Sequence, residues 1–133
     1  MKKVTLSILV LVPLFFWQFQ TNDLVASKAR GKEIYNEVCM TCHLVNGKGT
    51  PGTFPPVANS DYLLKPKNVL IRGVKFGLSG EVIVNGQKYN NAMPSPGLSD
   101  KEIADVLNYI GNSWGNKIDF ISEEMVKEVK EDK

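Results

Sequence analysis

Residues that bind metals or form cross-links are scarce in this sequence of 133 residues, which contains two cysteines and one histidine. Because a structural zinc site needs four ligands, the three nitrogen or sulfur ligands of the single Cys/His cluster do not suffice. A large excess of one charge is also missing, and a net charge of +2 gives no electrostatic footprint for nucleic acid or anionic membranes. The ordinary composition, 43% hydrophobic and 23% charged, excludes disordered, collagenous and repeat classes and fits one domain with a short appendage.

A long apolar run is confined to the N-terminus, and even there it is short. Met1–Lys3 is positively charged, and the mostly apolar stretch Val4–Phe19 contains Pro13. A membrane-spanning helix needs roughly 20 apolar residues, whereas the apolar core of a signal peptide needs roughly 7–15. Residues 1–26 are therefore expected to be a signal peptide cleaved after Ala26 or, alternatively, a retained N-terminal membrane anchor. Both alternatives place the rest of the chain in the periplasm or on the outer face of the cytoplasmic membrane.

The remainder of the chain reads as helices with few strand signals. Ser99 and Glu102 have the spacing of a capping box, which predicts the start of a helix that ends near Gly111. The Asn-Gly pair within residues 81–89 predicts a small β-hairpin. We expect an all-α fold, with a domain over residues 27–115 and a polar C-terminal extension over residues 116–133 that holds a short helix. The expected helices cover residues 27–38, 60–64, 66–78, 99–111 and 122–130.

The scarce cysteine and histidine residues lie together in the motif C-M-T-C-H, as Cys39, Cys42 and His43. This C-x-x-C-H spacing is a signature of covalent haem attachment, in which both thiols bond to one haem and the histidine binds its iron. A thioredoxin-like dithiol is expected near a β-α-β pattern, and none surrounds this pair. A structural disulfide across two residues would close too small a loop to stabilise the fold much. Haem attachment is the favoured interpretation, and an exported chain reaches the compartment where such attachment occurs.

A low-spin haem iron needs a second axial ligand, and no other histidine is available. Methionine is the leading alternative. Met93 lies between Ala92 and Pro94, outside any periodic segment, whereas Met40 is inside the attachment motif and Met125 is in the charged tail. The sequence therefore favours Met93 as the second ligand, against the simpler interpretation of a core methionine.

Several further motifs carry a family resemblance that extends from about residue 31 to residue 114. They are G-x-x-I-Y before C-M-T-C-H, then F-P-P-V, M-P and L-S-D-K-E-I-A-D-V-L-N-Y-I. With these motifs the chain resembles a class I monohaem cytochrome c, and V-N-G-Q-K-Y-N-N-A-M-P and N-S-W-G-N are similar to cytochrome subunits of dehydrogenases, nitrite reductases and oxidases. The resemblance implies the cytochrome c fold, one covalent haem c, and contact of Gly31 and Tyr35 with the last helix. It also implies that the Pro55 carbonyl orients His43, although Pro56 stays an alternative.

The function that follows is one-electron transfer rather than enzymatic catalysis. The principal hypothesis is a periplasmic or membrane-tethered carrier that exchanges electrons with donor and acceptor proteins. The alternative is a cytochrome subunit fixed in a dehydrogenase, reductase or oxidase complex. A haem enzyme or gas sensor with an open iron site would require displacement of Met93, and the chain has no distal histidine to supply acid–base chemistry.

Overall fold

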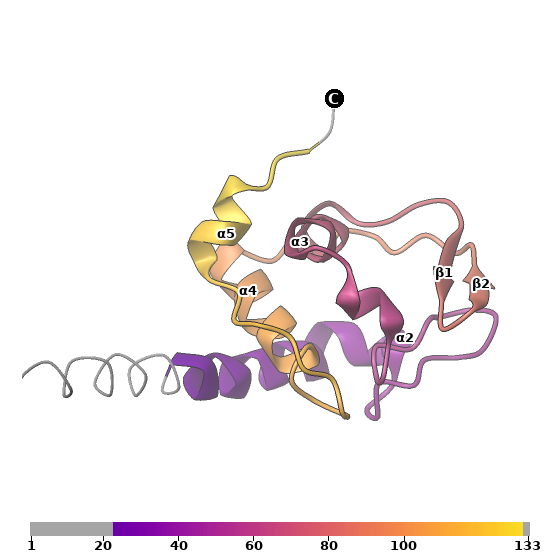
Figure 1. The fold of residues 1–133 in the computed structure, drawn as a ribbon, viewed down its shortest axis with the longest axis horizontal. Coiled ribbons are helices and arrows are strands. Elements are labelled where there is room, and N and C mark those ends of the chain that lie inside the picture. Colours follow the sequence, from indigo (N-terminus) through magenta and orange to yellow (C-terminus); the bar gives the residue numbers. More distant parts are fainter. Residues whose placement is uncertain (1–22, 132–133) are drawn as a thin grey trace, which may run out of the picture.

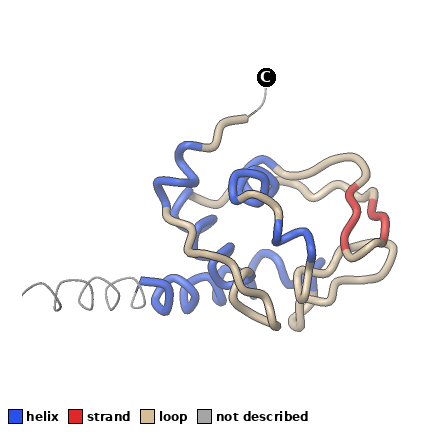
Figure 2. The backbone as a smooth tube through the Cα atoms, in the orientation of Figure 1, coloured by secondary structure: helices blue, strands red, loops and turns tan. Residues whose placement is uncertain are grey.

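Helices form most of the regular structure in the computed structural model, which describes residues 23–131 (Figures 1 and 2). Residues 1–22 lie outside the described part, and with them most of the segment expected to be a signal peptide or anchor. Among residues 23–131, no helix combines the length and the apolar character needed to cross a membrane. The predicted all-α class with one small hairpin is confirmed.

The first helix starts earlier and ends later than the sequence predicts. It is already helical at residue 23, changes to a π-turn over Tyr35–Cys39, and continues as α2 over Met40–His43. In the π-turn the Met40 N–H donates to the carbonyl of Tyr35, five residues earlier. Leu44 then adopts a positive φ of 63°, which ends the helix. The C-x-x-C-H motif therefore lies at the end of the helical segment, with Cys39 in the π-turn and Cys42 and His43 in α2.

The central helices form where the sequence predicts them. The capping box is present, since the Ser99 side chain accepts from the Glu102 N–H and the Glu102 carboxylate accepts from the Ser99 N–H. In the hairpin, Asn85 and Gly86 both have positive φ, as a tight two-residue turn requires. The bounds of the elements are 3₁₀-helix Asp61–Leu64, α3 Lys67–Phe76, β1 Val82–Val84, β2 Gln87–Tyr89, α4 Asp100–Ile110 and α5 Glu123–Glu128.

The N-terminal helix crosses α4 at very short range. A Cβ at Gly31 would overlap the carbonyl of Asp105, so this helix crossing requires glycine. Tyr35 is fully buried, and its ring lies 5.5 Å from that of Tyr109 and 5.2 Å from that of Trp114. The expected contact of Gly31 and Tyr35 with the last helix of the domain is therefore present.

A buried carboxylate strengthens the same crossing. Asp105 is 4% exposed and accepts from the Ser27 hydroxyl at 2.6 Å, from the Arg30 guanidinium at 2.6 and 2.7 Å, and from Lys101 at 2.9 Å. Burial raises the pKa of Asp105, but the hydrogen bonds from Arg30, Ser27 and Lys101 outweigh it and hold the pKa below its usual value. Two segments that are 78 residues apart in sequence are thereby joined.

The C-terminal segment, residues 116–131, packs against the domain through a few apolar residues. Ile121, Val126 and Val129 belong to the same hydrophobic cluster as α4. Asn108, which is fully buried in α4, bonds both the N–H and the carbonyl of Ile121 at 2.8 Å. The few apolar residues of the segment are thus held in place by a polar anchor in α4. Figure 1 shows α5 lying beside α4.

Candidate haem site

An apolar cavity of about 230 Å³ lies between the C-x-x-C-H motif, α3, α4, the hairpin and the loop that carries Met93. Every sequence-predicted site residue lines it, although Cys39 and Met93 are far apart in the chain. The remaining wall is almost entirely hydrophobic, with Val57, Leu70, Val74, Leu78, Val82, Val84, Val106, Leu107 and Ile110 among its members. Such a wall suits a flat apolar group that needs a few polar atoms in fixed positions.

The helical ending of the motif directs both thiols and the imidazole toward this cavity. Cys39 and Cys42 are free thiols, and both are partly buried. Burial, together with the nearby Cys42, raises the pKa of the Cys39 thiol to about 11. Burial lowers the pKa of His43, and its hydrogen bond to the backbone opposes that change. The imidazole is therefore kept neutral near pH 7, which is the form that binds a metal.

We call residues 44–56, which follow the motif, the histidine loop. The Pro55 carbonyl lies 2.9 Å from Nδ1 of His43, so the geometry selects Pro55 rather than Pro56 as the hydrogen-bond partner. Gly49 has a φ of +60°, donates its N–H to the His43 carbonyl at 3.0 Å, and approaches Pro55 so closely that a Cβ would lie 2.6 Å from the Pro55 carbonyl oxygen. The Tyr35 hydroxyl donates to the Leu44 carbonyl at 2.7 Å. The loop thus fixes one ring nitrogen of His43 and leaves the other to face the cavity.

We call residues 90–98 the methionine loop. Met93 is bound through its backbone to Leu78, with hydrogen bonds of 2.8 and 2.9 Å that form an isolated antiparallel bridge. Its side chain lines the cavity on a wall formed by a different part of the chain from the wall that carries His43. Of the other described methionines, Met40 packs against the core and Met125 is 39% exposed in α5.

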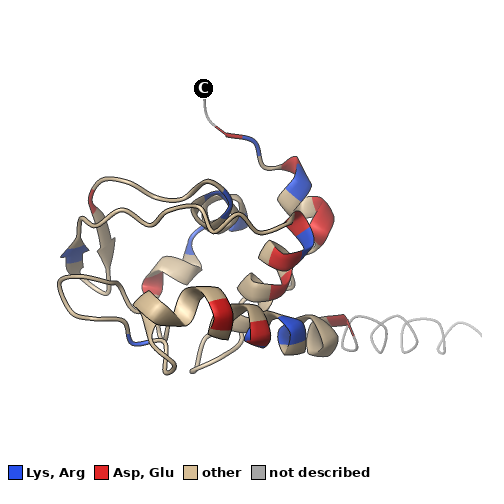
Figure 3. Cartoon of the chain, turned by 180° about the vertical axis from the view of Figure 1, so that it is seen from behind, with Lys and Arg blue, Asp and Glu red and all other residues tan. Residues whose placement is uncertain are grey.

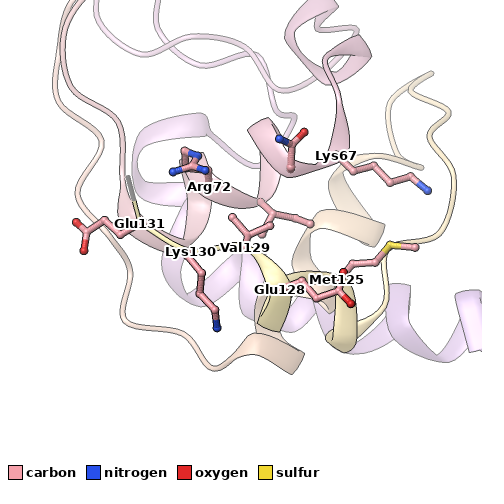
Figure 4. A pocket seen from close by; sticks show the side chains of 9 residues that line it. Lys67, Arg72, Met125, Glu128, Val129, Lys130 and Glu131 are labelled. Carbon is pink, nitrogen blue, oxygen red and sulfur yellow. The ribbon is translucent and has the colours of Figure 1, made fainter. Parts of the chain in front are cut away.

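A second cavity, of about 450 Å³, lies between α3 and the C-terminal segment (Figure 4). Met125 lines it, but no sequence-predicted site residue does. Its wall carries charged groups of both signs, and the figure shows several of them pointing away from one another: Lys67, Arg72, Glu128, Lys130 and Glu131. This mixed, open groove lacks the donor set that distinguishes the apolar cavity.

The residues around the apolar cavity fit a covalently bound haem. Two thiols, one imidazole nitrogen and one thioether sulfur meet in a single hydrophobic space, and sulfur and imidazole are the donors that haem attachment and iron ligation use. No group of three or more His, Cys, Asp or Glu side chains within residues 23–131 is arranged to hold a metal ion by itself.

Charge is spread over the helices with both signs present, as seen from the back of the molecule (Figure 3).

Several residues that shape the site were not singled out from the sequence for that role. The π-turn that ends at Cys39 has no local sequence signal, although such turns are common at functional sites. Gly49, Leu78 and the hydroxyl of Tyr35 act through tertiary contacts that no spacing rule predicts. Only the density of glycine between residues 47 and 52 hinted that the backbone there has unusual conformations.

Comparison with known proteins agrees with this geometry. The family model described as Cytochrome c matches residues 28–114. One cytochrome c-552 of Thermus thermophilus is 43% identical over 98 residues, which cover 70% of this chain and 66% of that protein. A second cytochrome c-552 from the same species is 44% identical over 94 residues, which cover 67% of this chain and 71% of the relative. The match therefore spans about two thirds of the length of these relatives.

Longer proteins are also similar to this chain over a stretch of comparable length. The cytochrome c subunit of a quinone-dependent alcohol dehydrogenase from Gluconobacter oxydans is 31% identical over 90 residues, covering 65% of this chain and 18% of that subunit. Because the family model covers well over half of the chain and the apolar cavity holds the matching donor set, the chain belongs to the cytochrome c family, whose covalently bound haem c transfers electrons.

Proposed function

We propose that Cys39 and Cys42 hold the haem covalently and that His43 and Met93 are its two axial ligands. The observation that carries this proposal is the convergence of all four side chains on one apolar cavity. The four come from two segments, a helix end and a distant loop, and the second cavity, beside α5, holds none of them. When bound, the haem supplies a one-electron couple between ferric and ferrous iron.

The protein's own groups give this couple a fixed and dry environment. The Pro55 carbonyl, 2.9 Å from Nδ1 of His43, holds the proton on that nitrogen and leaves Nε2 as the ligating atom. Acceptance of this hydrogen bond also makes the imidazole a more basic ligand. The wall of the cavity is mostly hydrophobic, and a haem held there by both His43 and Met93 would favour electron transfer over binding of small molecules.

The chain acts as an electron carrier between donor and acceptor proteins. Its identity to the two cytochromes c-552, at 43% and 44%, is higher than its identity to the dehydrogenase cytochrome subunits, at 26% to 33%. The charge of both signs over the helices supports partners recognised by shape rather than by a strong field. A role as a fixed subunit is the second candidate, and the similarity to the alcohol and fructose dehydrogenase cytochrome subunits supports it.

The proposal also includes export of the domain out of the cytoplasm. The charged Met1–Lys3 and the apolar Val4–Phe19 have the order of a signal peptide or a membrane anchor, so residues 1–26 deliver the domain over residues 27–115 to the periplasm or the outer face of the membrane. Residues 116–133 then accompany the domain as a C-terminal segment.

The ligand assignment is tested with Met93→Ala and a matched control, Met125→Ala, in protein matured with haem. An oxidised haem with a methionine–iron bond has a weak far-red absorption band. We expect this band to vanish in Met93→Ala and to persist in Met125→Ala, because Met125 lies at the other cavity. A band that survives in Met93→Ala would refute the assignment.

Carrier and subunit are separated by size fractionation of native periplasm and solubilised membranes. A carrier elutes at the size of the small chain. Recovery exclusively in a large assembly with a dehydrogenase or oxidase would support the second candidate instead.

A further inference from the structure

The methionine loop is fastened to the C-terminal end of α3 at three points. The first is steric. Gly77 follows the last residue of α3 with φ +84° and ψ 176°, and a Cβ there would lie 2.6 Å from the Met93 carbonyl oxygen and 2.9 Å from the Ser95 nitrogen. These distances are shorter than any side chain tolerates without movement of the backbone. Gly77 is therefore the residue against which the loop lies.

The second point is the backbone bridge between Leu78 and Met93. The Leu78 N–H donates to the Met93 carbonyl at 2.8 Å, and the Met93 N–H donates to the Leu78 carbonyl at 2.9 Å. The side chain of Leu78 is itself held against α3, because a Cβ at Gly73 would meet it at 3.3 Å. The bridge thus fixes the backbone of Met93 relative to a helix that forms part of the cavity wall.

The third point is the hydroxyl of Ser95, which donates to the Lys75 carbonyl at 2.8 Å. This carbonyl belongs to the last turn of α3, where backbone acceptors have no partner within the helix. The side chain two residues beyond Met93 therefore satisfies the helix end and limits movement of the loop away from it.

We propose that Gly77, Leu78 and Ser95 form a clamp that sets how often Met93 leaves the iron, with Gly77 as its central positioning residue. This inference rests on the proposed ligation by Met93. Because the clamp consists of contacts to one helix end that do not involve the Met93 side chain, substitution of either Gly77 or Ser95 frees the loop without removing the thioether. The population of the open, methionine-free state then rises, and external ligands compete better for the iron.

The test is the affinity of the oxidised protein for imidazole, which binds only when the sixth position is open. Apparent affinity scales with the open fraction, so we expect Gly77→Ala to bind imidazole about tenfold more tightly than the wild type, and Ser95→Ala about threefold more tightly. Gly80→Ala is the matched control, because Gly80 has the same φ of +84° and a Cβ there would meet no atom within 4 Å. Its affinity should stay within about twofold of the wild type.

The Met93→Ala background separates the clamp from other effects. There the sixth position is already open, so adding Gly77→Ala should leave imidazole affinity unchanged. An equal gain in that background would overturn the clamp, because the mutation would then be loosening the cavity and not the methionine. If Gly77→Ala does not fold, Ser95→Ala decides, and unchanged affinity in that variant would overturn the proposal.

The same imidazole affinities distinguish failure of the ligand assignment from failure of the clamp. If Met93→Ala binds imidazole no more tightly than the wild type, then Met93 is not the ligand, and the clamp falls with it. If Met93→Ala binds tightly while Gly77→Ala and Ser95→Ala both resemble the wild type, the ligand assignment stands and only the clamp is refuted.

Discussion

His43, which the histidine loop holds in place, and Met93, which the methionine loop carries, line the same cavity, yet different contacts hold the two loops. The histidine loop is bonded mainly to itself and to the segment that follows it: Thr50 and Phe54 form a bridge, and the Gly47 carbonyl accepts from both Val57 and Ala58 at 2.8 Å. The methionine loop bonds to the end of α3 and, through the Asn91 side chain, to the Thr53 carbonyl at 3.2 Å. It contains no buried residue, whereas Gly47 and Gly49 of the histidine loop are buried. Segments with few buried contacts open at lower free energy than the rest of a fold. We therefore expect the methionine side of the proposed haem site to open before the histidine side.

His43 and Met93 also differ in how they are connected to the rest of the fold. His43 ends a helix that is packed against α4, next to the two cysteines that hold the haem in our proposal. Met93 is 50 residues later and reaches the cavity only through contacts between distant segments. A local change in the histidine loop should thus disturb the whole fold, whereas a change in the methionine loop should alter mainly ligand exchange.

The largest expected effect is that of Gly49→Ala in the histidine loop. The Cβ would overlap the Phe54 carbonyl and lie 2.6 Å from that of Pro55, at a φ of +60°. Strain and overlap together should lower the free energy of unfolding by about 3 kcal/mol. Chemical denaturation followed by tryptophan fluorescence measures the change.

Gly52→Ala is the control in the same loop, because its φ is +74° and the nearest atom to its Cβ would be 4.0 Å away. It should cost only the conformational strain, about 1 kcal/mol. Equal losses in the two variants would show that the approach to Pro55 does not matter, and the contrast between the loops would weaken.

A smaller effect is expected from Asp105→Asn, which acts where the N-terminal helix crosses α4. The pKa of Asp105 is lowered in the folded state, so its contribution to stability is complete above the unfolded pKa of about 4 and is lost as the pH falls through the lower folded pKa. The variant should lose about 2 kcal/mol at pH 7. Denaturation curves between pH 7 and about pH 2 should then converge for the two proteins.

Imidazole affinity sharpens this prediction, because Asp105 touches neither loop through its side chain in the contacts described above. The affinity for imidazole should be unchanged in Asp105→Asn although global stability falls. A parallel gain in affinity would mean that ligand exchange follows global unfolding, and the distinction between the two loops would be lost.

The smallest effect is expected from Lys75→Met, on the methionine side. The Lys75 ammonium lies 2.8 Å from the Asp100 carboxylate and donates to the Val126 carbonyl at 2.8 Å, so it joins α3 to α4 and to α5. Its loss should cost about 1 kcal/mol, since the group is largely buried and the methionine keeps the apolar stem. Urea titration provides the measurement.

Lys127→Met is the matched control, because Lys127 forms an exposed ion pair with Glu123 within α5. Its stability should equal that of the wild type within error. If both lysine variants behave alike, then Lys75 does not brace the helix that carries the clamp.

Most elements were predictable because their signals are local. Ser99 and Glu102, three residues apart, predict the start of α4. Asn85-Gly86 predicts the hairpin turn between the two short strands. The first helix runs past residue 38 through the π-turn to His43, and no local residue pattern there predicts the continuation. The C-terminal segment looked polar in sequence, since only a few apolar residues, spaced irregularly, enter the core.

The sequence by itself determined the chemistry: two thiols and an imidazole within five residues, and one methionine outside any helical pattern. It determined these things because covalent attachment depends on a fixed spacing along the chain. Only the tertiary structure decided that Pro55 and not Pro56 bonds His43, that Gly49 and Gly77 admit neighbouring backbones, and that Asn108 anchors the last segment. These relations join residues that are distant in sequence, and their strength depends on differences of a few tenths of an ångström, which spacing along the chain does not encode.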